Sequence, residues 1–382
     1  MNHTVRSWGS LAMLCLVLTT TLTSITKAQD PSFSQFYANR IYLNPAFTGL
    51  DGGIAANASA RLQWVGIDQG FRTYAVTAET QLPVARLGLG LNLVRNEEAI
   101  ASLTTNKMGL ALSYTIPGNN NNVHFGFETQ VVQKRLDWDR LVFSDELDPV
   151  YGLTYQTSAI PVLDRITFGD VSFGVVWRHV SNKKVGRNGL RKIRSHLGMS
   201  FHHLPYLFSK SSEGNDSFLN LDGRVAPRTT IHGGMIIPIT VLSGVGRNIS
   251  ISPNFKLDMQ GYKFMNFREN LTVGTVGVYG MMGSVYIGAL YQNKYWAPSA
   301  FHSDAFIMTI GGYVNPVSQR SGNAPKLMIG FSVDLNNTGV GPAAGSVYEL
   351  HVRYQFSTNI SGSARNGGSR SAKRILDCKD FF

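Results

Sequence analysis

The alternation of apolar and polar residues with a period of two, sustained over runs of about ten residues, constrains the fold of this chain more than any other feature. In the segment 53–64, apolar side chains recur at every second position from Ile54 to Trp64, while Asn57, Ser59 and Arg61 lie between them. Successive side chains of a β strand point to opposite faces, so each such run predicts a strand with one apolar and one polar face. The chain is therefore predicted to be all-β.

About fourteen strands of this kind follow one another along the chain. Three of them, 229–237, 269–280 and 284–294, are less clearly patterned because apolar residues occur on both faces. The predicted strands lie near residues 53–64, 71–82, 86–95, 106–116, 123–134, 170–179, 192–203, 229–237, 248–258, 269–280, 284–294, 303–314, 326–335 and 345–356.

Strand length separates two possible architectures. A soluble sandwich or barrel buries the apolar face and usually has strands of about five or six residues. A transmembrane barrel turns the apolar face to lipid, uses strands of about 9–11 residues and carries aromatic girdles. Strand lengths, glycines on the polar faces and aromatics near strand ends favour a transmembrane antiparallel β-barrel over residues 53–356. These aromatics are Trp64, Tyr74, Tyr114, Trp177, Tyr313, Tyr348 and Phe356.

Residues 1–28 have the pattern of a secretory signal peptide. Arg6 precedes a mostly apolar stretch over 11–22, and a cleavage site follows at Ala28. A lipoprotein signal at Cys15 is the alternative, but apolar residues continue past that cysteine. After residue 28, no run approaches the ~20 apolar residues that a membrane-spanning helix requires.

Cleavage after Ala28 would change the charge and the cysteine content. Arg6 and Lys27 leave with the leader, so the formal net charge falls from +11 to +9 (11 − 2). In an exported protein, this basic balance favours anionic lipid headgroups or an acidic protein as partners, and not nucleic acid. The single remaining cysteine, Cys378, cannot form an intrachain disulfide.

The segment 29–52 has the pattern of neither a strand nor a long helix. Phe33, Phe36 and Tyr37 are spaced i, i+3, i+4, which would place them on one face of a helical turn. Asn44 and Pro45 predict a helix start, with Asn as the cap and Pro at the first helical position. The barrel is therefore preceded by a compact, aromatic segment.

Connection lengths predict how the barrel sits in the membrane. The joins 83–85, 117–122 and 281–283 are short and typical of periplasmic turns, whereas 135–169 and 204–228 are long and typical of outer loops. An even strand number then places both termini in the periplasm.

From residue 357 the alternation stops, and 357–382 forms a basic, Ser/Gly-rich tail. Its composition is typical of a disordered end, with a periplasmic partner contact as the alternative. The candidate contact residues are Arg370, Lys373, Arg374, Cys378 and Phe382.

Charged residues of both signs fall on the polar, inward faces of the predicted strands. Because both signs occur, we interpret them mainly as ion pairs that fill and stiffen the lumen. A selectivity lining for an anionic solute is the alternative. The candidate lumen charges are Arg61, Glu79, Glu128, Lys134, Arg178, Arg194, Glu349 and Arg353.

No catalytic motif, cofactor site or metal site stands out, and the chain is predicted not to be an enzyme. His202 and His203 are adjacent and would point to opposite faces of a strand, which makes them poor joint metal ligands. The acidic stretch 137–148 could collect Ca²⁺, but it lacks the glycine at the sixth position of an EF-hand loop. A structured, solvated loop is the favoured interpretation.

Several stretches resemble the PorP/SprF family of outer-membrane proteins associated with type IX secretion in Bacteroidetes-type bacteria. The strongest match is QDPSFSQFYANRIYLNPAFTG (29–49). Others are LDWDRLVFSD (136–145), HLGMSFHHL (196–204), ISPNFKLDMQGYKF (251–264), LMIGFSVDLN (327–336) and GSVYELHVRYQF (345–356). Two departures concern the subtype: Val347-Tyr348 stands where members commonly have a single His, and Lys379 stands where Pro usually follows the terminal Cys.

The resemblance implies an outer-membrane component of the type IX secretion system, sometimes linked to gliding motility and adhesins. It implies one of two roles. The protein would hold the periplasmic machinery, through secretion subunits or a peptidoglycan-associated adaptor, or it would help a secreted cargo reach the surface. The alternative is a channel of the fatty-acid-transporter or porin type. A surface hydrolase would require a catalytic serine that nothing in the sequence identifies.

The opening segment also resembles the N-terminal hatch of fatty-acid transport barrels, which folds into its own lumen. In water, its aromatic residues would form an exposed apolar patch. We therefore expect this segment to plug the lumen or cap its mouth. The candidate plug residues are Phe33, Phe36, Tyr37, Asn44 and Pro45, together with Tyr42 and Phe47.

Overall fold

The protein is described by a computed structural model. The described residues are 30–50, 53–67, 70–82, 85–98, 102–148, 150–153, 157–158, 163–185, 191–205, 218, 225–239, 249–262, 270–295, 304–314, 326–337 and 344–356. The signal peptide predicted over 1–28 and the tail over 357–382 lie outside them. No helix within the described ranges is long and apolar enough to cross a membrane.

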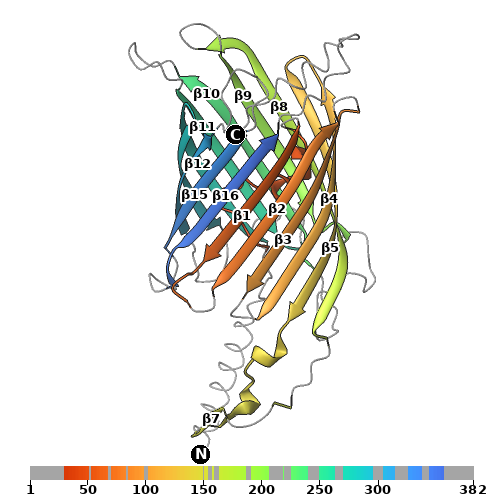
Figure 1. Ribbon diagram of the computed structural model, residues 1–382, viewed down its shortest axis with the longest axis vertical. Coiled ribbons are helices and arrows are strands. Elements are labelled where there is room, and N and C mark those ends of the chain that lie inside the picture. The colour runs from red at the N-terminus through yellow and green to blue at the C-terminus, as the bar shows by residue number, and fades with distance from the viewer. Residues whose placement is uncertain are drawn as a thin grey trace, which may run out of the picture.

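Fourteen antiparallel strands form a closed barrel with strongly tilted strands (Figure 1), which confirms the fold predicted from the alternation. The strands are β1 (Ile54–Gln63), β2 (Phe71–Leu82), β3 (Leu87–Glu98), β4 (Leu103–Pro117), β5 (Asn121–Leu136), β8 (Arg165–Val185), β9 (Arg191–His202), β10 (Arg228–Ile239), β11 (Ile249–Gln260), β12 (Leu271–Met282), β13 (Val285–Tyr295), β14 (Asp304–Val314), β15 (Lys326–Asn337) and β16 (Val347–Phe356).

Each strand pairs with its neighbour in sequence, and β1 pairs with β16 to close the ring. Ile54 lies opposite Phe356, so both ends of the sheet meet at one mouth of the barrel. The connections 83–86, 118–120 and 283–284 lie at this same end, which we call the short-turn mouth. The opposite end, the long-loop mouth, carries the connections 137–164 and 203–227.

The described residues of the connection from β5 to β8, here called the excursion, extend beyond the long-loop mouth (Figure 1). It contains two 3-10 helices, η3 (Trp138–Arg140) and η4 (Ser144–Glu146), and a two-stranded sheet of β6 (Leu147–Asp148) and β7 (Gly152–Leu153). Acidic side chains fix its backbone: the Asp145 carboxylate accepts hydrogen bonds from Thr157 and Ser158. The acidic stretch therefore lies in a structured loop, as expected from the sequence.

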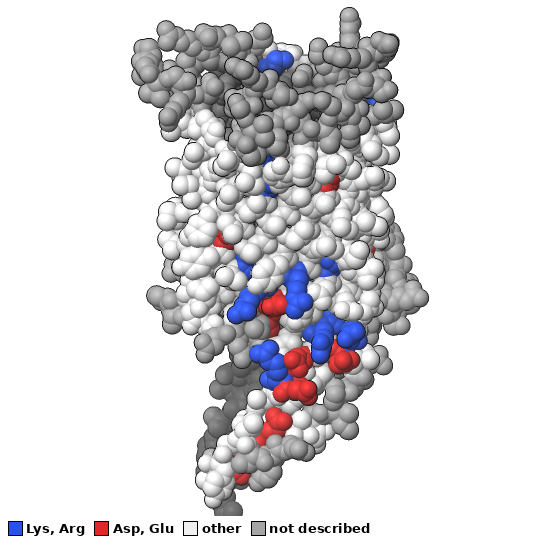
Figure 2. All heavy atoms as spheres, in the orientation of Figure 1, with Lys and Arg blue, Asp and Glu red and all other residues white. Residues whose placement is uncertain are grey.

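The outer face of the barrel is apolar over a broad band. Burial alternates along the strands, and the exposed positions carry large apolar side chains such as Val131, Leu110 and Ile287. Figure 2 shows few charged side chains across this band, whereas Lys, Arg, Asp and Glu gather toward the long-loop end. Because this band faces lipid, apolar side chains point outward and polar side chains point into the lumen, which is the reverse of a soluble protein.

One aromatic residue assigned to the lipid face lies elsewhere. Tyr313 faces the lumen, where it packs against the interior apolar cluster, so its placement in the outer girdle was wrong. Gly311 and Gly312 interrupt the alternation of apolar and polar side chains just before Tyr313, so the sequence does not show which face Tyr313 occupies. The burial of Ile307 and Thr309 fixes odd-numbered residues of β14 as inward.

Candidate functional site

Residues 30–50, here called the N-terminal segment, lie inside the barrel. The segment contains α2 (Arg40–Leu43) and the 3-10 helix η1 (Pro45–Phe47). Every residue from 33 to 50 is buried except Tyr42, which is half-buried. Apolar side chains gain about 1.5–3 kcal/mol each from such burial. The candidate plug residues are thus placed in the lumen, whereas closure of the lumen to solutes stays a prediction.

The start of η1 follows from its local sequence. The Asn44 side chain accepts a hydrogen bond from the Ala46 N–H at 2.9 Å, and Pro45 occupies the first helical position. Pro has no N–H to leave unsatisfied there, and its φ suits the first turn. Gly49, with φ of 70°, takes the left-handed conformation that favours glycine as the chain turns toward β1.

The aromatic residues ahead of α2 do not share one helical face, and that prediction was wrong. Phe33 has no regular structure, and residues 34–39 form bends and turns. Phe36 and Tyr37 join the main interior cluster, with ring centroids 4.4 Å apart. Phe33 packs edge-on against Tyr42 at 5.4 Å, in a separate cluster. Contacts with two different parts of the barrel wall, and not helical periodicity, set their directions.

The inner wall opposite these aromatics is itself apolar, which explains the unclear patterning of the strands at 269–280 and 284–294. One face of these strands meets lipid and the other meets the N-terminal segment. The wall residues in the interior cluster are Val176, Tyr279, Tyr286, Leu290, Ile307 and Met328.

Glycines on the wall make room for the segment backbone. Gly88, Gly126 and Gly174 sit on inward faces of β3, β5 and β8. A Cβ on Gly88 would collide with the carbonyl of Thr48, and a Cβ on either of the other two would collide with residues 44–46. The wall is therefore shaped for close approach by this segment.

The carboxylate of Glu349 binds the start of the N-terminal segment inside the lumen. Glu349 accepts the backbone N–H groups of Ser34 at 2.8 Å and Gln35 at 3.0 Å. Arg61 forms ion pairs with Glu349 at 3.3 Å and with Asp334 at 3.0 Å. The Ser34 hydroxyl donates to Asp334 at 2.6 Å and also contacts Arg61. Hydrogen bonds to an ionised acceptor are stronger than neutral ones, so this is a strong anchor.

A second carboxylate holds the other end. Glu79 accepts the Gly49 N–H at 2.8 Å and forms an ion pair with Arg353 at 3.1 Å. Arg353 also donates to Asn57 at 3.1 Å on the neighbouring strand. Four predicted lumen charges are thus brought together as ion pairs, and two of them also bind segment backbone, which the sequence did not reveal.

The remaining predicted lumen charges stand apart from these anchors. Glu128 is fully buried and accepts from Asn92 at 2.9 Å. Arg178 is buried, and Lys134 and Arg194 are half-buried on inward faces. A selectivity lining for an anionic solute stays a prediction.

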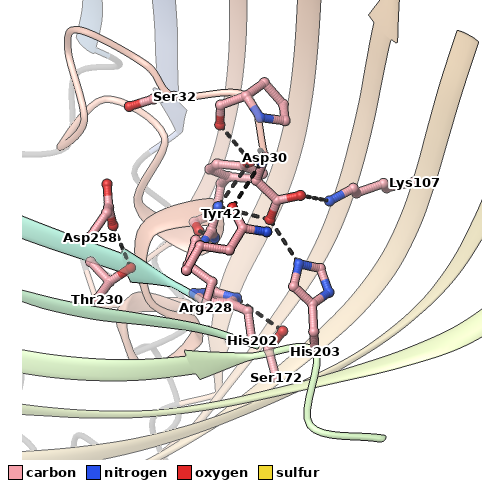
Figure 3. A network of polar contacts seen from close by, with 12 residues as sticks. Asp30, Ser32, Tyr42, Lys107, Ser172, His202, His203, Arg228, Thr230 and Asp258 are labelled. Atoms are coloured by element: carbon pink, nitrogen blue, oxygen red, sulfur yellow. Dashed lines mark hydrogen bonds and ion pairs between the residues drawn. The ribbon is translucent and has the colours of Figure 1, made fainter. Parts of the chain in front are cut away.

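A cluster of charged side chains surrounds Asp30 at the long-loop mouth (Figure 3). Its carboxylate pairs with Lys107 at 2.9 Å, with His203 at 2.8 Å and with Arg228 at 3.0 Å. All four side chains are nearly buried, with 5–12% of their surface exposed. Arg228 also lies over the ring of Tyr42, 4.8 Å from its centroid. The start of the segment is therefore held by three cationic groups at once.

Two groups of this cluster lie outside the strands and have shifted pKa values. Burial alone would raise the pKa of Asp30, but the charges of Lys107, His203 and Arg228 hold it well below its ordinary value of 3.8. Burial would lower the pKa of His203, but the carboxylates of Asp30 and Asp170 raise it above 6.5. The ring of His203 donates to Asp170 at 2.9 Å when protonated. Both shifts favour the charged, paired state.

The middle of the segment is fixed by neutral contacts. The Asn44 side-chain amide donates to the carbonyls of Val175 at 3.2 Å and Met199 at 3.1 Å. The Tyr37 hydroxyl and His196 Nε2 are 2.9 Å apart. These contacts reach strands β8 and β9, so the segment binds the wall along its length.

The adjacent histidines His202 and His203 both point into the barrel, so the prediction of opposite faces was wrong. β9 ends at His202, and His203 has a φ of 63°, which turns its ring back toward Asp30. Over the described part of the chain, no three His, Cys, Asp or Glu side chains are grouped to hold a metal ion. The candidate tail contacts, from Arg370 to Phe382, lie outside the described residues.

The sequence reasoning missed the Asp30 cluster. Lys107 was detectable, because it falls on the inward face of the predicted strand 106–116. Asp30 directly follows the predicted cleavage region, but no local pattern connects it to residues 77 or more positions away. Arg228 and His203 lie at strand ends, where the two-residue period no longer assigns a face.

Comparisons with known proteins identify one family. The family model described as type IX secretion system membrane protein PorP/SprF matches residues 25–354. No protein with a curated description matches the chain.

Solved barrels are similar in outline. Omp33 of Acinetobacter baumannii is 8% identical, with a TM-score of 0.37, covering 81% of this chain and 100% of its own. A FadL homologue of Pseudomonas aeruginosa is 11% identical, with a TM-score of 0.37, covering 82% and 92%. The CymD monoaromatic hydrocarbon channel is 9% identical, with a TM-score of 0.41, covering 84% and 93%.

Proposed function

The chain belongs to the PorP/SprF family of type IX secretion system membrane proteins, and from this premise we propose that it acts as a closed outer-membrane barrel that binds other proteins of the secretion pathway. In this role the barrel is a fixed platform in the membrane, and its work is done by the parts that project from it.

The occupied lumen carries this proposal. Residues 33–50 are almost completely buried within the barrel, and glycines on the wall leave space shaped for their backbone. Carboxylates anchor both ends of the segment, through Glu349 and Glu79. An open conduit for a solute or an unfolded protein would need the whole segment to leave, and every one of these contacts opposes its departure.

We infer two candidate contacts for partners, one from the described structure and one from the sequence. The excursion 137–158 stands beyond the long-loop mouth and exposes apolar side chains, among them Val150 and Tyr151, which are 79% and 80% exposed. The basic tail 357–382 follows β16 at the opposite mouth. We propose the tail as a contact for periplasmic secretion subunits and the excursion as a contact for surface cargo.

A secretion assay tests the proposal. The gene is deleted and then complemented with the full chain or with a chain ending at residue 356. Loss of the gene should leave cargo with a C-terminal secretion signal in the periplasm. The truncated chain should insert in the membrane but fail to restore delivery. Unchanged delivery after gene deletion would refute the proposed role.

Conductance in a planar bilayer tests the alternative. The purified barrel should show no steady conductance while the N-terminal segment is in place. A large, stable conductance from the unmodified protein would favour the channel function and contradict the closed platform.

A further inference from the structure

The N-terminal segment crosses the lumen from one mouth to the other. At its end, Gly49 is bound by Glu79, close to the short-turn end of β2. At its start, Asp30 is bound by Lys107, His203 and Arg228, which lie toward the ends of β4, β9 and β10 at the long-loop mouth. Residue 30 and the start of β1 are therefore at opposite ends of the barrel.

Intermediate contacts give the same direction. Ser34 is bound by Glu349, two positions after β16 begins at the long-loop mouth. Thr48 accepts from Ser113, four positions before β4 ends at the short-turn mouth. The segment therefore starts at the long-loop mouth and ends at the short-turn mouth, although Tyr42 returns to Pro31 and Arg228 before the chain continues to Thr48.

Connection lengths indicate which mouth faces outward. Outer-membrane barrels have short turns in the periplasm and longer loops outside. In this barrel the connections at one mouth, among them 118–120 and 283–284, span 2 to 11 residues, whereas those at the other mouth, among them 137–164 and 203–227, span 4 to 28. By this rule, Phe356 and Ile54 are periplasmic and Asp30 is at the outer mouth.

We propose that the amino terminus of the processed chain is displayed at the outer surface of the membrane, with the Asp30 cluster as its anchor. Cleavage after Ala28 would leave Gln29 alone ahead of Asp30. Asp30 and Phe356, the first and last residues that the structure describes, then lie at opposite sides of the membrane. This departs from the expectation that both termini are periplasmic.

The anchor has the properties that such a display needs. Asp30 is held by its backbone as well as its side chain, because its N–H donates to Gln260 at 3.1 Å. The Pro31 carbonyl accepts the Tyr42 hydroxyl at 2.6 Å, which ties the start of the segment to the residues before η1. Arg228 joins both parts by pairing with Asp30 and donating to the Tyr42 hydroxyl at 3.1 Å. The end is thus rigidly held at the rim.

Cysteine labelling on intact cells tests the proposal. In a Cys378→Ser background, Gln29→Cys is compared with two reference variants. Tyr151→Cys reports the excursion, where the side chain is 80% exposed, and Ser284→Cys reports the exposed turn between β12 and β13. A membrane-impermeant maleimide should label Gln29→Cys and Tyr151→Cys on intact cells, and Ser284→Cys only after the outer membrane is permeabilised.

Two results would overturn the proposal. Labelling of Gln29→Cys only after permeabilisation, or never, would place the terminus in the periplasm or inside the protein. Labelling of Tyr151→Cys only after permeabilisation would show that the long-loop mouth faces the periplasm. Where Gln29→Cys fails to insert, a short epitope placed between Ala28 and Gln29 and probed by antibody on intact cells gives the same two outcomes. These measurements do not depend on secretion, so they can refute this proposal without refuting the proposed function.

Discussion

Replacing Glu349 by Gln should loosen the N-terminal segment without changing the shape of the lumen. The two side chains have nearly the same size, so the substitution removes charge and acceptor capacity only. In the native protein the carboxylate accepts two backbone N–H groups, from Ser34 at 2.8 Å and Gln35 at 3.0 Å. A glutamine has one acceptor oxygen and would turn its NH₂ toward the second N–H.

The expected magnitude follows from these bonds. Two hydrogen bonds to a charged group are worth roughly 1.5–3 kcal/mol each, and the amide would retain one neutral bond of about 1 kcal/mol. The buried N–H left without an acceptor adds a cost of about 1–3 kcal/mol. These contributions sum to a loss of about 3–8 kcal/mol in the free energy that holds the segment in the lumen. Even the lower limit, about 3 kcal/mol, is roughly a 150-fold change in the opening equilibrium.

Alkylation of a buried cysteine measures this change. Ala38 is 8% exposed and differs little in size from Cys, so Ala38→Cys in a Cys378→Ser background reports opening of the segment. In purified protein, Glu349→Gln should accelerate alkylation about 100-fold or more. Glu128→Gln is the matched control, because Glu128 is equally buried but accepts from Asn92 on the wall. Equal rates in the parent and in Glu349→Gln, or equal acceleration by the control, would refute the reasoning.

Two further predictions use the same reporter. Gly126→Ala should expel η1, because its Cβ would lie under 3.0 Å from segment backbone atoms; overpacking costs about 1–3 kcal/mol. Gly169→Ala, whose Cβ meets nothing within 4 Å, should leave the alkylation rate unchanged. Protection should also depend on pH. The pKa of His203 is raised, so its contribution is complete below about 6.5 and is lost as the pH rises through the raised value. The pKa of Asp30 is lowered, so its contribution is complete above about 3.8 and is lost only in stronger acid. Normalised to the exposed Tyr151→Cys, alkylation should be slowest between about pH 4 and 6.5. A flat profile from pH 5 to 9 would contradict the role of His203.

The alternation, together with the length of the alternating runs, was sufficient to predict the transmembrane barrel. The period of two holds along most strands, because lipid selects apolar residues on one face as strongly as a core does. The alternation is less clear at 269–280 and 284–294 because the inward side chains of these strands contact the N-terminal segment. Tyr279, Tyr286 and Leu290 are the apolar residues on this inward face. A strand with apolar residues on both faces is therefore itself a signal that something apolar occupies the lumen.

The site was harder to predict, because its contacts join residues far apart in sequence. Asn44 and Pro45 could be assigned from local rules, since a helix cap depends only on its neighbours. The pairing of Asp30 with Arg228, and the grip of Glu349 on Ser34, depend on the closure of the ring. Which carboxylate accepts which backbone N–H is set by strand register, and no local pattern encodes it.

The interior position of residues 30–50 has a consequence for the order of assembly. These residues touch strands from both ends of the sequence, so we expect them to be in place before β1 and β16 join. If the barrel closed first, residues 30–50 with their several aromatic side chains would have to thread into the lumen along its whole length. Biogenesis should therefore proceed with the leading residues enclosed as the last seam forms, and a chain lacking them should be slow to seal or should seal in the wrong register.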